Sequence, residues 1–173
     1  MTTAPLRAPV FVYDGDCAFC SACARFITRH VVKGRNSTVV TAWQFADLRA
    51  LGLTEAECDS AVQWVGVDRV GKRIKAAGPV AIARLLRGSG WLWRGVGGLL
   101  GTRAVLAVAW PVYNWIARHR DRMPGGTAAC ALPQAERDRL GTGRYARTGP
   151  VQHEPAGAPA ADARKVSGIS VEG

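Results

Sequence analysis

Residues 10–20 read VFVYDGDCAFC and place a cysteine pair directly after a short apolar run. The first residues of this stretch are β-rich, and the Asp-Gly-Asp that follows them is typical of a turn. Beyond the turn, side chains suited to one helix face recur at Phe19, Cys23, Phe26, Ile27 and His30. The pattern predicts a strand, a tight turn and a helix that begins at the cysteine pair.

Strand and helix patterns then alternate up to residue 88. Further strands are predicted over residues 38–41, 61–67 and 73–75, and further helices over residues 46–51 and 79–87. A capping box formed by Thr54 and Glu57 starts another helical turn. The resulting β-α-β-α-β-β-α order is that of a thioredoxin-like α/β domain, which we place at residues 8–88.

The chain after residue 88 divides into a helical extension and a tail. Residues 89–140 are expected to form helices packed on the first domain, with a loop at 124–133 that contains Cys130. We expect no membrane span, because a span requires about 20 apolar residues and the longest uncharged stretch, Ala104–Ala117, is shorter. Residues 141–173 are rich in Gly, Pro and Ala without apolar periodicity, which predicts a disordered tail.

Composition is that of a globular protein with a basic surface. The chain has 173 residues, 48% of them hydrophobic, and its net charge of +10 favours anionic partners. The arginines are spread along the chain, so no nucleic-acid partner is expected. The densest basic run, RHRDR at 118–122, is predicted to be a solvated helix end. Peripheral contact with a membrane surface through Trp and Arg side chains stays open.

Five cysteines are present, and three of them lie between residues 17 and 23. An odd number argues against a framework of structural disulfides, and the N-terminus lacks the apolar core of a secretory signal. We therefore expect a cytoplasmic protein whose thiols stay reduced unless they take part in redox chemistry.

The Cys17-x-x-Cys20 pair is the candidate catalytic centre. A sulfur at a helix N-terminus meets free backbone N–H groups and the positive end of the helix dipole, and both favour the thiolate that attacks disulfides. We expect Cys17 to be the nucleophile and Cys20, one turn later and more buried, to be the resolving thiol. Asp14 is a candidate proton relay for this pair, with turn formation as its structural alternative, and Asp16 suits a cap or turn role.

Other functions remain open at this stage. Cys17, Cys20 and Cys23 with one distant cysteine, Cys58 or Cys130, could form a metal-binding module. An iron–sulfur run would continue as C-x-x-x-C-P, but Ile27 stands at the position of that next cysteine, so no cofactor is expected. Cys23 is expected to be a small buried hydrophobe. A third alternative is a basic peripheral-membrane or scaffold protein whose redox motif is vestigial.

The residues also resemble a known family. Residues 10–20 are similar to the opening of the DCC-type thiol-disulfide oxidoreductases. Asp14, Cys17 and Cys20 occupy the Asp and the two Cys positions of that family's Y-D-G-x-C-x-x-C motif. VYNWIARHR at 112–120 resembles the late V-Y-x-x-x-A-x-x-R segment of that family, and GPVA at 78–81 is a looser match. The resemblance, over about residues 10–132, implies a thioredoxin-like fold and an enzyme that exchanges disulfides with a thiol- or disulfide-containing protein or small molecule.

Overall fold

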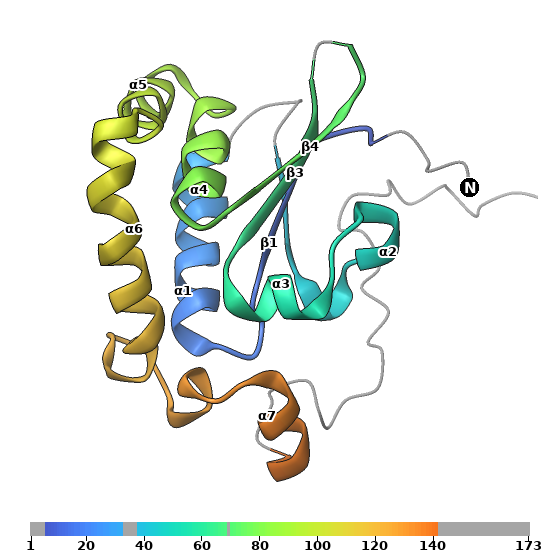
Figure 1. Cartoon of the computed structure of the whole chain (residues 1–173), viewed down its shortest axis with the longest axis vertical. Coiled ribbons are helices and arrows are strands. Elements are labelled where there is room, and N and C mark those ends of the chain that lie inside the picture. Colours follow the sequence, from blue (N-terminus) through green and yellow to red (C-terminus); the bar gives the residue numbers. More distant parts are fainter. Residues whose placement is uncertain (1–5, 33–37, 69, 142–173) are drawn as a thin grey trace, which may run out of the picture.

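A four-stranded mixed sheet forms the centre of the protein (Figure 1). The computed structural model describes residues 6–32, 38–68 and 70–141. The strands are β1 (Val10–Tyr13), β2 (Val39–Ala42), β3 (Gln63–Val67) and β4 (Arg73–Ala77), and their order across the sheet is β2-β1-β3-β4. β1 runs parallel to β2 and antiparallel to β3, which pairs antiparallel with β4.

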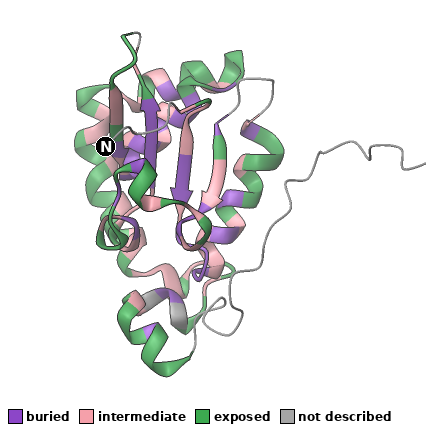
Figure 2. Ribbon diagram, turned by 90° about the vertical axis from the view of Figure 1, so that its right-hand side faces the viewer, coloured by how far each residue is buried: buried purple, intermediate pink, exposed green. Residues whose placement is uncertain are grey.

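Alternating side chains of the central strands supply a core on each face of the sheet. Phe11 and Trp64, which are opposite each other in β1 and β3, pack with α4 (Gly78–Arg87). Val12 and Val65 pack on the other face with the segment that contains α2 (Leu48–Leu51) and α3 (Glu55–Ser60). This alternation follows from the period of two residues in a strand. Figure 2 shows buried residues in the central strands and in the helices around them.

The helix that carries the cysteine pair is α1 (Ala18–Phe26), which continues as a π-helical turn, η1 (Ile27–Val31). The predicted capping box at Thr54 is present at the start of α3, and Gly52 ends α2 in the left-handed conformation. The predicted β-α-β-α-β-β-α order and the thioredoxin-like fold class are confirmed.

The chain after the sheet forms α5 (Trp91–Leu100), α6 (Arg103–Arg118), two short 3-10 turns, η3 (Arg120–Arg122) and η4 (Ala128–Ala131), and α7 (Gln134–Leu140). α5 and α6 pack against α4. The approach of α5 is close, because a Cβ on Gly97 would lie 2.7 Å from the carbonyl oxygen of Ala83. The segment 124–133, which was expected to be a loop, contains a 3-10 turn around Cys130.

α5 and α6 leave many large apolar side chains exposed. In the described part of the chain, no single helix is long and apolar enough to cross a membrane, and α5 and α6 reach that length only as a pair bent by 85°. Of the tail that the sequence predicts to be disordered, residues 142–173 lie outside the described residues. The domain boundaries stay predictions.

Candidate active site

The cysteine pair lies where β1 passes into α1. The turn between them is held by the Asp16 N–H, which donates to Asp14 Oδ1 at 3.1 Å, and by the Ser21 hydroxyl, which donates to the Gly15 carbonyl at 3.0 Å. Cys17 is the N-cap of α1, and its Sγ accepts a hydrogen bond from the Cys20 N–H at 3.4 Å. Asp16 therefore belongs to the turn, and the cysteine itself caps the helix.

The two cysteines differ in exposure, and in the opposite sense to the sequence-based expectation. Cys17 is completely buried, whereas Cys20 is partly exposed. The expectation that Cys20 would be the more buried thiol was wrong. The physical reason is that η4 and α7, from the far end of the chain, cover the beginning of α1, where Gln134 Nε2 donates to Asp16 Oδ2 at 3.3 Å.

The pKa values of the two cysteines are shifted in opposite directions. A hydrogen bond from Cys17 and the positive charge of Arg120 lower the pKa of Cys20, and they outweigh the opposing effect of its burial. The pKa of Cys17 is raised, first by its hydrogen bond with Cys20 and then by burial. In this arrangement the pKa of Cys20 is lower than that of Cys17.

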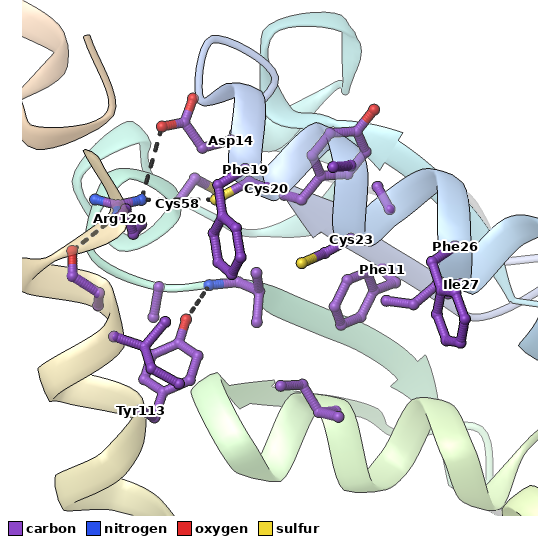
Figure 3. A pocket seen from close by; sticks show the side chains of 18 of the residues that line it. Phe11, Asp14, Phe19, Cys20, Cys23, Phe26, Ile27, Cys58, Tyr113 and Arg120 are labelled. Carbon is purple, nitrogen blue, oxygen red and sulfur yellow. Dashed lines mark hydrogen bonds and ion pairs between the residues drawn. The ribbon is translucent and has the colours of Figure 1, made fainter. Parts of the chain in front are cut away.

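Arg120 reaches the site from the 3-10 turn η3, directly after α6 ends (Figure 3). Its Nη1 lies 3.9 Å from Cys20 Sγ and 3.9 Å from Asp14 Oδ2, and its Nε donates to the Ala117 carbonyl at 2.9 Å. The prediction that residues 118–122 form a solvated helix end was wrong for Arg120, whose side chain is only 18% exposed. The change from α-helix to 3-10 turn places this side chain toward the site.

Asp14 is the buried anion at the centre of these contacts. Arg137 Nη1, from α7, donates to Asp14 Oδ2 at 2.8 Å, and Gln44 Nε2 donates to Asp14 Oδ1 at 3.2 Å. Arg137 is itself fully buried, and its Nη2 donates to Asp59 Oδ1 at 2.9 Å. The carboxylate thus holds α7 and η3 against the turn. Its expected role as a proton relay stays a prediction.

Arg120 and Arg137 were not predicted from the sequence as site residues. Arg120 had a signal, because it is the last residue of the VYNWIARHR segment that carried the family resemblance. Arg137 had none: it is one arginine of many in a basic chain, and only the packing of α7 pairs it with Asp14.

A largely apolar cavity of about 500 Å³ opens beside Cys20. Aromatic and aliphatic side chains from β1, α1, η1 and α6 form most of its wall, among them Phe11, Phe19, Phe26, Ile27 and Ile116. Asp14 and Arg120 lie together at one end, next to Cys20 (Figure 3). The cavity therefore offers an apolar group a place beside a sulfur and a cation.

The other cysteines are distributed around this centre. Cys23 lines the cavity and is exposed, so the expectation of a small buried hydrophobe was wrong. Cys58 and Cys130 are buried, and all five cysteines are free thiols. Among residues 6–32, 38–68 and 70–141, no group of three or more His, Cys, Asp or Glu side chains is placed to hold a metal ion.

Comparison with known proteins returns one family. The sequence model of the DCC1-like thiol-disulfide oxidoreductases matches residues 11–126, which include β2 to β4, all of β1 except Val10, the cysteine pair and Arg120. No curated protein and no solved structure matches the chain. Cys130 and Arg137 lie beyond the matched residues.

Proposed function

Because the chain belongs to the DCC1-like thiol-disulfide oxidoreductase family, we propose that it exchanges disulfides through the Cys17–Cys20 couple, with Cys20 as the attacking thiolate. The observation that supports this assignment is the position of Cys20 Sγ, on the cavity and 3.9 Å from Arg120 Nη1, while Cys17 is buried. It reverses the roles expected from chain order alone, which rest on the helix dipole acting on the first cysteine.

The exchange proceeds in two steps. The Cys20 thiolate attacks one sulfur of a substrate disulfide, forms a mixed disulfide and releases the other sulfur as a thiolate. Cys17 then loses its proton and attacks Cys20 Sγ, which forms the Cys17–Cys20 disulfide and releases the second substrate sulfur. The substrate gains two electrons and the couple loses two, and the reverse sequence oxidises a dithiol.

Arg120 and Asp14 have distinct parts in this proposal. The guanidinium of Arg120 stabilises the Cys20 thiolate before attack and again when Cys20 is the leaving group. Asp14 is a positioning residue, since its ion pair with Arg137 and its 3.9 Å approach to Arg120 fix that cation beside the sulfur. The apolar wall of the cavity favours a substrate with an apolar or aromatic group next to its disulfide.

The test is a trapping experiment in a background that carries Cys23→Ser and Cys130→Ser, so that neither thiol resolves the intermediate. The probe is 5,5′-dithiobis(2-nitrobenzoate), an aromatic, anionic disulfide that suits the cavity and Arg120. Cys17→Ser is expected to trap a mixed disulfide on Cys20, and Cys20→Ser to react slowly. Trapping by Cys20→Ser alone would overturn the assignment in favour of Cys17, and trapping by neither variant would overturn the proposed function.

A second candidate function, contact with a membrane surface, is favoured by one observation. Several large apolar side chains of α5 and α6 are exposed, including Trp91 at 87% and Trp115 at 52%. Trp is common at membrane interfaces, and the net charge of +10 complements anionic lipids. We propose an anionic lipid surface as the partner of these two helices. This function is compatible with disulfide exchange.

A further inference from the structure

Cys130 is a third thiol at the redox centre. It lies in η4, beyond the residues matched by the family. Both Cys130 and Cys17 are completely buried. The hydrogen bond with Cys20 and burial raise the pKa of Cys17, and a hydrogen-bonding contact with the Cys130 side chain opposes them, so the two side chains are neighbours. Thr127 Oγ1 is 3.6 Å from Cys130 Sγ. Cys17 therefore has a cysteine neighbour on two sides, Cys20 toward the cavity and Cys130 toward the C-terminal segment.

The segment that carries Cys130 is held firmly against the turn before Cys17. Gln134 bonds to Asp16, the residue next to Cys17, and Arg137 pairs with Asp14 at 2.8 Å. A second ion pair joins Arg137 to Asp59 at 2.9 Å. Such buried, multiply bonded contacts hold Cys130 in place, so its neighbour relationship with Cys17 does not depend on an unanchored loop.

We propose that Cys130 exchanges with the Cys17–Cys20 disulfide and makes this centre a three-thiol relay. The inference rests on the proposed function, which supplies that disulfide. The Cys130 thiolate attacks Cys17 Sγ, the Cys17–Cys20 bond breaks, and a Cys17–Cys130 bond forms. Cys20 leaves with the electron pair and takes up the proton that Cys130 loses. One disulfide replaces another, so no further oxidant is needed.

The surroundings favour this direction of exchange. The leaving sulfur is Cys20, which Arg120 stabilises as a thiolate, and a better-stabilised thiolate leaves faster. The product keeps its disulfide beneath the C-terminal segment and returns Cys20 to the cavity as a free thiol beside Arg120. It also links α1 covalently to the segment that covers it. The oxidised enzyme would thus remain reactive toward a second substrate at Cys20.

The experiment equilibrates the full chain in glutathione redox buffers, quenches it with acid, alkylates free thiols and maps disulfides after trypsin. Trypsin places Cys17, Cys20 and Cys23 in one peptide, residues 8–25, and Cys130 in another, residues 123–137. A Cys17–Cys20 bond is therefore internal to one peptide, whereas a Cys17–Cys130 bond joins two. Fragment ions assign the cysteine used within residues 8–25.

We expect both bonds in the wild-type chain at intermediate buffer potentials. Cys20→Ser is expected to form the Cys17–Cys130 bond alone, and Cys23→Ser, the matched control on the same helix, to behave as wild type. A wild-type chain that forms Cys17–Cys20 but never Cys17–Cys130, with the same absence in Cys20→Ser, would overturn the relay alone. Absence of any bond to Cys17 or Cys20 would instead overturn the proposed function. The wild-type measurement needs no variant to fold.

Discussion

Arg120 Nη1 lies 3.9 Å from Cys20 Sγ, although 100 residues separate the two in the chain. The cation reaches the sulfur because α6 ends at Arg118 and the chain turns back through η3. The C-terminal extension thus places a cation beside the cysteine pair as well as packing on α4.

Arg120→Gln is expected to raise the pKa of Cys20, because the variant removes a positive charge that stabilises the thiolate. At a pH below that pKa, alkylation of Cys20 should slow by about tenfold for each unit by which the pKa rises. The measurement is the pH profile of iodoacetamide alkylation in a Cys23→Ser background. Arg118 is an exposed arginine of the same basic run, so Arg118→Gln is the control and should leave the pH profile of alkylation unchanged. Equal profiles for both variants would contradict the assigned role of Arg120.

Asp14→Asn is expected to lower the free energy of unfolding by about 3 kcal/mol, because it leaves the fully buried Arg137 with its weaker partner. Asp59→Asn removes the other partner of the same guanidinium. Because the Asp59 side chain is 27% exposed, this variant should lower the free energy of unfolding by only about 1 kcal/mol. Urea unfolding of the two variants measures the difference. A larger loss for Asp59→Asn would show that Asp14 is not the main anchor of α7.

Gly97→Ala is expected to destabilise the protein by about 1–3 kcal/mol, because its Cβ would lie 2.7 Å from backbone atoms of α4. Gly98→Ala, one residue later in α5, meets no atom within 4 Å and should stabilise the helix by about 0.5–1 kcal/mol. Thermal unfolding compares the pair. The packing of α5 on α4 would be in doubt if both substitutions had the same sign.

Binding to anionic lipid vesicles is expected for the wild-type chain and should weaken as salt is added. Trp91→Ser should reduce this binding, because it removes the most exposed aromatic side chain of α5. Val70→Ser changes an equally exposed apolar residue in the turn between β3 and β4 and serves as the control. Co-sedimentation measures the bound fraction. Wild-type protein that stays in the supernatant at low salt would rule out the proposed lipid partner.

Much of the fold could be predicted because its signals are local. The apolar run at residues 10–13, the Asp-Gly-Asp turn and the cysteine at the helix start act over a few residues, and the structure contains each of them. The same holds for the capping box at Thr54 and for Pro79 in the first turn of α4. Backbone sterics and short-range hydrogen bonds determine such features, so the order of residues is sufficient to predict them.

Only part of the candidate site could be predicted from the sequence in this way. The sequence alone identified Cys17, Cys20 and Asp14 by their spacing and by the family resemblance. It did not determine which thiol is buried, because that depends on η4 and α7, which reach the start of α1 from more than a hundred residues away. Chain order placed the helix dipole on Cys17, whereas tertiary packing buried that sulfur and brought a cation to Cys20. Burial and charge act through space, so only the folded chain decided which of the two cysteines has the lower pKa.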